Sequence, residues 1–227
     1  ERLQDNNPYF MSVENIIKAC KISCSILEEC FSNFDFETEI EIAKYLRKKA
    51  RVMNYKLAFP PLIVSGNNFL EIHHKPNKTK LKKFIIADFG VKYKGHYSDV
   101  TRMLYKGKPN QEEIELYNLV RKVQENTLRN LKIGMDYCDL DLKARKDFGR
   151  YKKYFEHSLG HGVGRKIHQK PWINFKSKDI VKESDVVTIE PGIYSKKFGI
   201  RIEDTVLVKK NKIEILTPLK KELVVLD

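Results

Sequence analysis

The sequence lacks long apolar stretches and has few cysteines. No run approaches the roughly 18 consecutive apolar residues that a membrane-spanning helix needs, and no secretory leader pattern opens the printed sequence. Three of the 4 cysteines, Cys20, Cys24 and Cys30, fall on one predicted helix, without a second pair to complete a zinc site. Small buried thiols in a reducing compartment are the simpler interpretation. We therefore expect a cytoplasmic protein without a membrane partner.

Signals for nucleic-acid binding and for separate domains are also missing. A formal net charge of +13 favours polyanions in general, but the lysines are scattered and no aromatic interleaving accompanies them. Nucleic acid is therefore not the expected partner. No Gly-, Ser- or Pro-rich tract divides the chain, which predicts one domain over residues 1–227. The first residue is Glu1 rather than methionine, so we expect a cleaved product or part of a longer protein.

The apolar patterning predicts helices in the first part of the chain and strands later. Thr38 with Glu41, and Asn110 with Glu113, have the spacing of helix-opening capping boxes. The predicted helices cover about 12–30, 38–51, 110–134 and 139–146, and the clearest strands are 62–64, 84–87, 186–189 and 205–208. Without a regular βαβ alternation, this order favours an α+β fold with a largely antiparallel sheet.

Five ligand-type side chains lie in short motifs between residues 86 and 205. They are Asp88 in IADFG (86–90), Asp99 in SDVTR (98–102), His161 in HSLGHGVG (157–164), Glu190 in IEPGIY (189–194) and Glu203 in RIEDT (201–205). Carboxylates and an imidazole suit manganese, cobalt, zinc or iron(II). Two such ions about 4 Å apart can lower the pKa of a shared water and direct it at a carbonyl. The motifs therefore predict a two-metal hydrolytic site.

The spacing of the first two aspartates fits one β-hairpin. A turn centred on residues 93–94 would place Asp88 directly opposite Asp99, on the same face of the ladder.

The two glutamates fit a second hairpin in the same way. A turn centred on residues 196–197 would place Glu190 opposite Glu203. Directly opposed like charges destabilise a sheet unless a cation compensates them. Surface acids on solvent-facing strands are the alternative, but the neighbouring isoleucines make these strands apolar. We therefore expect a metal centre.

The histidines carry less specific signals. Glycines on both sides of His161 would let the imidazole approach a crowded site and argue against a helix there. His157 and His161 are four residues apart, but the His-Glu-x-x-His pattern is absent. His168 could donate to a developing oxyanion, or could be an ordinary polar residue, and His73 and His74 carry the same ambiguity.

Taken together, the motifs resemble the Xaa-Pro peptidase family, which comprises prolidase, aminopeptidase P and their creatinase-fold relatives. The resemblance covers essentially the whole chain in the segments IVSGNNFLEIHH (63–74), ADFGVKYKGHYSDVTR (87–102), HSLGHGVGRKIHQKP (157–171), TIEPGIY (188–194) and FGIRIEDTVLV (198–208). It implies a pita-bread fold, in which helices cover a curved, largely antiparallel sheet.

The resemblance also implies roles for individual residues. Asp88 would bind one metal, His161 and Glu190 would bind the other, and Asp99 and Glu203 would bridge them. His73 and His168 would contact the substrate, and Glu190 would carry a proton. Arg201 and Tyr194 would orient Asp88. Manganese or cobalt is the first expectation for the two ions, and zinc or iron the second.

The implied reaction is hydrolysis of the Xaa-Pro bond in dipeptides or at peptide N-termini by a metal-bridging hydroxide. The substrate would carry proline at its second position, and the full-length form would be a homodimer. Two departures stand out. The family often has His-Glu where this chain has His168-Gln169, and its members usually carry an N-terminal domain ahead of this segment.

Two other functions stay open. Methionine aminopeptidases share the five ligands but typically have Glu-Pro-Met where this chain has Glu190-Pro191-Gly192. Non-catalytic binding modules of the same fold generally lose ligands, and none is lost here. Assays of Xaa-Pro against Met-Ala peptides separate the first alternative, and metal binding without hydrolysis would favour the second.

Overall fold

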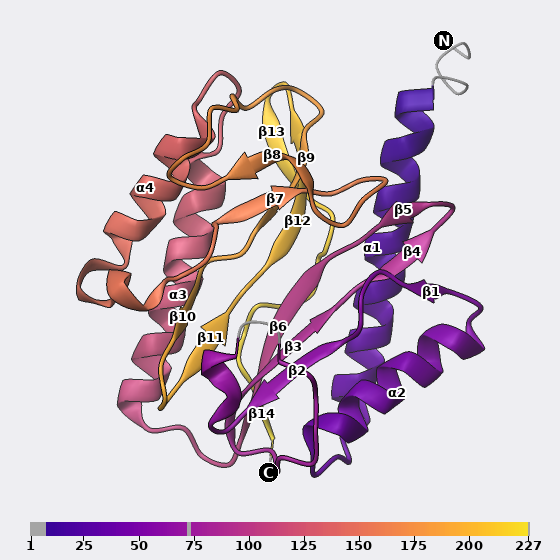
Figure 1. The fold of residues 1–227 in the computed structure, drawn as a ribbon, viewed down its shortest axis with the longest axis vertical. Coiled ribbons are helices and arrows are strands. Elements are labelled where there is room, and N and C mark those ends of the chain that lie inside the picture. Colours follow the sequence, from indigo (N-terminus) through magenta and orange to yellow (C-terminus); the bar gives the residue numbers. More distant parts are fainter. Residues whose placement is uncertain (1–7, 72–73, 227) are drawn as a thin grey trace.

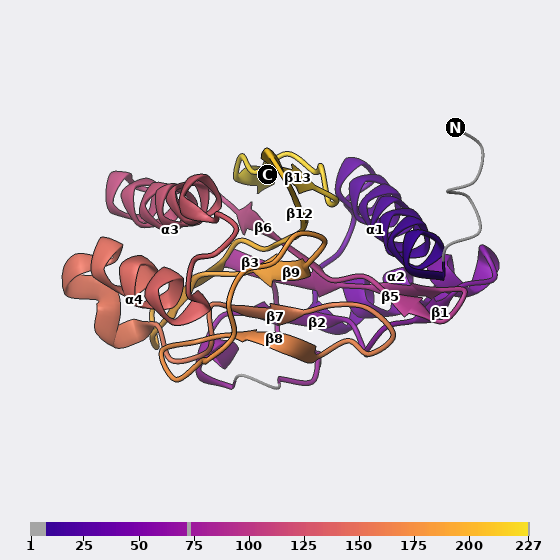
Figure 2. The ribbon, with the colours of Figure 1, turned by 90° about the horizontal axis from the view of Figure 1, so that it is seen from above.

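Two pairs of helices flank a central set of strands in the computed structural model, which describes residues 8–71 and 74–226. Figures 1 and 2 show α1 and α2 on one side of the strands and α3 and α4 on the other. The helices are α1 (Pro8–Ser32), α2 (Glu39–Val52), α3 (Gln111–Asn130) and α4 (Tyr137–Asp147), with 3-10 turns η1 (Asn68–Leu70) and η2 (Gly149–Tyr154). Across the described residues, none of these helices combines the length and the apolarity needed to cross a membrane.

The strands of the described residues form two larger sheets and two small ones. A four-stranded sheet has the order β14-β6-β3-β2 and a five-stranded sheet the order β13-β12-β9-β7-β8, while β1-β4-β5 and β10-β11 form smaller ladders. The strand bounds are β1 (Lys56–Leu57), β2 (Leu62–Ser65), β3 (Lys83–Phe89), β4 (Val91–Tyr93), β5 (His96–Tyr97), β6 (Val100–Lys106), β7 (Gly160–Gly162), β8 (Gln169–Ile173), β9 (Val186–Ile189), β10 (Gly192–Tyr194), β11 (Gly199–Arg201), β12 (Asp204–Lys209), β13 (Lys212–Ile215) and β14 (Val224–Leu226). Among the strands that the structure describes, only β14 and β6 pair in parallel, so the predicted α+β class with a largely antiparallel sheet is confirmed.

Strand β3 is buried on both faces. Phe84 and Ile86 belong to the core shared with α3 and α4. Ile85, Ala87 and Phe89 belong to the core shared with α1 and α2. Successive strand residues point to opposite faces, so a strand between two cores is apolar at nearly every position. This explains the unbroken apolar run in the sequence and places the end of β3 in the middle of the molecule.

The two predicted capping boxes lie where helices begin. The Glu41 carboxylate accepts a hydrogen bond from the Thr38 amide at 2.9 Å, just ahead of α2. The Asn110 side chain accepts from the Glu113 amide at 2.9 Å, and the Glu113 carboxylate accepts from the Asn110 amide at 2.9 Å. Both helix starts predicted from these pairs are confirmed.

The other helix ends differ from prediction by a few residues. Helix α1 already begins at Pro8, rather than near Ser12. Helix α3 ends at Asn130, and Gly134 lies in the turn that follows, with a φ of 84°. Glycine is therefore used for a left-handed turn residue after the helix rather than for its cap.

The predicted register of the first hairpin is wrong by two residues. Asp88 lies opposite Thr101, not opposite Asp99, and the turn is centred on Lys94-Gly95. The φ angles of these two turn residues are 44° and 81°. Two consecutive positive φ angles are what a tight hairpin turn of the primed type needs, and glycine meets that need at the second position. The turn chemistry therefore fixes the register.

The register of the second hairpin is confirmed. Gly192 lies opposite Arg201 in the β10–β11 ladder, and Ile189 opposite Asp204 in the β9–β12 ladder. The two ladders share one register. Continued through the gap between them, this register places Glu190 opposite Glu203.

Candidate metal centre

The five predicted ligand side chains lie together in one cavity of about 740 Å³. They come from the end of β3 (Asp88), the residue before β6 (Asp99), the middle of β7 (His161), the residue after β9 (Glu190) and the residue before β12 (Glu203). The cavity is therefore built from both large sheets. Apolar side chains line another part of it, namely those of Phe59, Pro60, Pro61, Leu62 and Trp172.

One backbone contact joins the two sheets at the centre of the site. The amide of Glu203 donates to the carbonyl of Thr101 at 3.2 Å, and the two residues form an isolated antiparallel bridge. The Thr101 hydroxyl also donates to Oε2 of Glu203 at 2.6 Å. Thr101 is opposite Asp88 in the ladder. A strand of one sheet thus fixes a carboxylate that belongs to the other.

Two groups of three ligand atoms share Glu203. In the first group, the ligand atoms of His161, Glu190 and Glu203 lie within 4.8 Å of one another. In the second group, the ligand atoms of Asp88, Asp99 and Glu203 also lie within 4.8 Å of one another. Nε2 of His161 lies 3.4 Å from Oε1 of Glu190 and 3.7 Å from Oδ2 of Asp99. Either group could hold a cation, and the shared glutamate could contact both.

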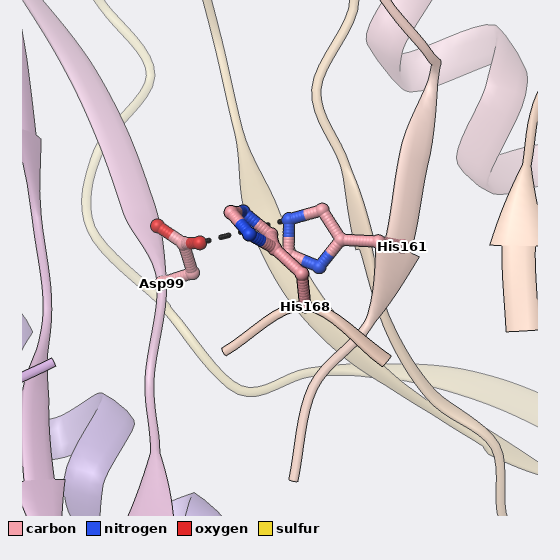
Figure 3. Close-up of side chains that lie close together, drawn as sticks. All are labelled: Asp99, His161 and His168. Atoms are coloured by element: carbon pink, nitrogen blue, oxygen red, sulfur yellow. Dashed lines mark ion pairs between the residues drawn. The ribbon is translucent and has the colours of Figure 1, made fainter. Parts of the chain in front are cut away.

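His168 belongs to a third such group, with Asp99 and His161. Figure 3 shows the two imidazoles and the Asp99 carboxylate turned toward one another. The rings of His161 and His168 meet edge to face, with centroids 4.4 Å apart. His168 precedes β8 and is exposed, so it lies on the open side of the cavity.

The glycines next to His161 are required by the neighbouring strands. A Cβ atom on Gly160 would lie 2.0 Å from the Thr188 carbonyl oxygen, and one on Gly162 would lie 2.3 Å from the Lys170 carbonyl oxygen. Both distances are far below van der Waals contact. The Thr188 hydroxyl accepts from the His161 amide at 3.1 Å and donates to Oε1 of Glu190 at 3.1 Å. Close strand packing therefore positions His161 beside Glu190, and the predicted absence of a helix here is confirmed.

Arg201 bonds both Asp88 and Tyr194. Nη2 of Arg201 donates to Oδ2 of Asp88 at 2.5 Å, and Nη1 donates to the Tyr194 hydroxyl at 3.2 Å. Nε2 of His157 lies 2.9 Å from the same hydroxyl. His157 also lines the cavity, so it is a site residue that was not predicted from the sequence. The four-residue spacing between His157 and His161 is the sequence feature that indicates such a role.

The buried carboxylates of the cluster repel one another, which favours a bound cation. Burial, and after it the Glu203 charge, raise the pKa of Asp99 well above its usual range, while burial and Glu190 do the same for Glu203. Burial raises the pKa of Glu190 to about 7 and lowers that of His161 to about 4. Neutral imidazole is the form that binds metals. Divalent cations would relieve the repulsion among these carboxylates.

One oxygen atom of Asp88 also favours a bound cation. Its Oδ1 is buried and has no hydrogen-bond partner within residues 8–71 and 74–226. Burial raises the pKa of Asp88, although the Arg201 guanidinium opposes that effect. A buried carboxylate oxygen without a donor is costly unless an ion coordinates it. The donor set therefore fits divalent metal ions. Of the predicted site residues, His73 falls outside the described part of the chain.

Comparison with solved structures and known sequences supports the fold and the family. An X-Pro aminopeptidase from Thermotoga maritima superimposes with a TM-score of 0.90 at 34% identity, over 96% of this chain and 64% of that one. The prolidase from Pyrococcus horikoshii gives a TM-score of 0.89 at 32% identity. These neighbours have the pita-bread fold that the motifs implied, which is therefore confirmed.

The sequence relatives are longer than this chain. An Xaa-Pro dipeptidase of Pyrococcus furiosus is 37% identical over 223 residues, covering 93% of this chain and 63% of the relative. An uncharacterized peptidase of Methanocaldococcus jannaschii is 38% identical over 217 residues, with 61% of its length covered. The chain thus spans about three fifths of the relatives that it matches. The model of metallopeptidase family M24 matches residues 14–210, and the chain belongs to that family.

Proposed function

We propose that this chain is the catalytic part of a peptidase that uses two divalent metal ions to hydrolyse the bond before proline. The observation that carries the proposal is the pair of ligand groups that share Glu203 inside one cavity. The Xaa-Pro enzymes among the relatives support the choice of bond.

The ligand roles that the family resemblance implies are compatible with the two groups. Asp88 would hold one ion, His161 and Glu190 the other, and Asp99 and Glu203 would contact both. The unpartnered Oδ1 of Asp88 supports the first assignment. Carboxylate and imidazole donors suit manganese or cobalt, and they also accept zinc or iron. Elemental analysis decides among these ions.

The remaining residues would hold and move the substrate. The bound ions supply a Lewis acid for the scissile carbonyl and a water of lowered pKa. Arg201 would keep Asp88 in place, and His168 at the open side of the cavity would donate to the substrate's carbonyl oxygen. Glu190 would take a proton from water and deliver it to the leaving proline nitrogen. A role for His73 at the leaving proline stays a prediction.

The apolar part of the cavity supports a proline-containing substrate. Phe59, Pro60, Pro61 and Trp172 line it, on chain segments separate from the ligands. A pyrrolidine ring is compact and apolar, so burying it there is favourable at about 25 cal/mol per Å². Specificity for proline would come from this lining rather than from the metals.

The decisive experiment combines elemental analysis with a substrate series. The purified chain is assayed with Xaa-Pro dipeptides, with Xaa-Pro peptides of three to six residues, and with Met-Ala peptides. We expect about two metal ions per chain and hydrolysis only at Xaa-Pro bonds. Cleavage of Met-Ala peptides alone would indicate a methionine aminopeptidase instead. Bound metal without hydrolysis of any peptide would indicate a binding module.

We also propose a single domain over residues 1–227 and a cytoplasmic location. The match of one family model to residues 14–210 supports the first. The four cysteines, which are free thiols with three of them buried, support the second. The homodimer of the longer form stays a prediction.

A further inference from the structure

A buried histidine that plays no part in the ligand groups lines the same cavity. His74 is 5% exposed. Its Nε2 lies 2.7 Å from Oε2 of Glu39, and its Nδ1 lies 2.9 Å from Oε2 of Glu71. A carboxylate only accepts hydrogen bonds, so an imidazole that bonds carboxylates through both nitrogens carries two protons. The two carboxylates therefore favour the imidazolium form of His74 in the cavity wall.

Its main partner, Glu39, is completely buried at the start of α2. Besides His74, Oε1 accepts from the Ser65 amide at 2.7 Å and from the Asn68 side chain at 3.0 Å, and Oε2 accepts from the Asn77 amide at 3.3 Å. The helix N-terminus also favours the negative charge. One carboxylate thus ties α2 to the end of β2 and to residues 74–77.

The backbone strengthens the same connection. The amide of Glu39 donates to the Thr79 carbonyl at 3.2 Å, and the amide of Ile40 donates to the Asn77 carbonyl at 2.9 Å. Residues 77–79 are therefore tied to the start of α2 by two main-chain bonds as well as by the Glu39 side chain. Residues 74–76, which line the cavity, have the His74–Glu39 ion pair as their side-chain link to the helix.

We propose that Glu39 and His74 are positioning residues that fix the cavity wall of His74, Lys75 and Pro76 against which the substrate binds. The proposal rests on the peptidase function proposed above. Residues 74–76 become less well fixed when His74 cannot bond Glu39, because among the described residues no other ion pair connects them to α2. Substrate binding would then weaken while the ligand groups stay in place.

The first test compares His74→Gln with Lys78→Gln. The His74 variant removes the buried pair, whereas Lys78 is an exposed residue of the same segment. We expect His74→Gln to raise KM for an Xaa-Pro dipeptide about tenfold with kcat nearly unchanged, and Lys78→Gln to change neither. Glu39→Gln should resemble His74→Gln, and thermal melts establish that each variant is folded.

The second test uses pH, because loss of the proton on His74 should imitate the substitution. The charged groups within bonding distance of His74 are Glu39 from α2 and Glu71 from the preceding turn, and Asn68 beside them is neutral. Burial opposes the charged imidazole, but the bonds to Glu71 and Glu39 outweigh it and raise the pKa of His74. The KM ratio of His74→Gln to the unsubstituted protein should therefore be largest at low pH and approach one as pH rises through that pKa. Any titration of the metal centre cancels in the ratio.

The third test needs no catalysis. Trp172 is the only tryptophan of the chain and lines the same cavity. Its fluorescence can follow a titration with L-proline, whose Kd should rise about tenfold in His74→Gln and stay the same in Lys78→Gln.

These readouts separate the two proposals. If the unsubstituted protein cleaves no peptide but proline binding still depends on His74, the peptidase function fails and the positioning role stands. If folded His74→Gln matches the unsubstituted protein in KM, in its pH dependence and in proline binding, the positioning role is overturned.

Discussion

Arg201 donates a hydrogen bond to Asp88 at 2.5 Å, although the two residues lie 113 positions apart in the chain. The guanidinium binds one carboxylate oxygen and leaves the other, Oδ1, without a partner among the described residues. A metal ligand held in this way has one oxygen fixed by the protein and one directed at the ion.

The first prediction concerns this pair. Arg201→Met should lower metal affinity by 10- to 100-fold, because the Asp88 carboxylate loses the group that orients it. Isothermal titration of the metal-free protein with Mn²⁺ measures the change. Lys197→Met, an exposed residue of the hairpin that carries Arg201, is the matched control and should bind as before. Equal affinities in the two variants would contradict the orienting role.

Glu203→Gln should abolish cleavage and remove at least one of the two ions. The amide keeps the size of the side chain but loses the charge that both ligand groups share. Metal content by elemental analysis and turnover of an Xaa-Pro dipeptide are measured on the same sample. Glu112→Gln on the exposed first turn of α3 serves as the control. Full activity of Glu203→Gln at controlled metal would refute the assignment.

Asp204→Asn should destabilise the fold in a pH-dependent way. The buried Asp204 carboxylate accepts from Nη2 of Arg102 at 2.7 Å and pairs with the Lys221 ammonium. Breaking a buried pair of this kind costs about 3–5 kcal/mol. Urea unfolding at neutral pH measures the loss, and Asp35→Asn on the surface should be nearly neutral.

The pH dependence of that loss follows from the direction of the shift. Burial opposes the charged form, but Arg102 and Lys221 outweigh it and hold the pKa of Asp204 below its usual value. The unfolded chain therefore binds the proton more readily, so the stabilisation is complete above the unfolded pKa and is lost as pH falls through the folded one. The stability difference between the unsubstituted protein and Asp204→Asn should shrink in acid. A difference independent of pH would contradict the ion pair.

Gly95→Ala should cost about 1–2 kcal/mol without changing the metal content. Gly95 has a φ of 81°, and no other heavy atom lies within 4 Å of where its Cβ would be, so the cost is conformational rather than steric. Denaturant midpoints measure the loss, and elemental analysis measures the metal. A variant as stable as the unsubstituted protein would show that the turn can change its type.

The same turn shows what the sequence could and could not predict. The apolar run that forms β3 predicted the strand, but the pairing depends on which two residues adopt positive φ, and apolar patterning carries no such information. A two-residue error leaves each side chain on its original face, because the alternation has period two. Asp88 and Asp99 therefore meet in one cavity despite the wrong pairing.

His157 and Thr101 escaped prediction for a different reason. Their partners, the Tyr194 hydroxyl and the Glu203 carboxylate, are 37 and 102 residues distant. Only the packing of the two sheets brings these groups together. The ligand-type residues could be recognised from their own chemistry, whereas a hydroxyl or a second histidine acquires a role only through its neighbours.

The bridge between Thr101 and Glu203 has a consequence for how the protein assembles. Because the candidate ligands belong to two sheets, neither sheet presents a complete set of donors before the other docks. Metal binding is then linked to docking, and each ion acts as a reversible cross-link whose contribution grows with free metal concentration. Chelation should therefore loosen the interface between the sheets before it melts the helices that cover them.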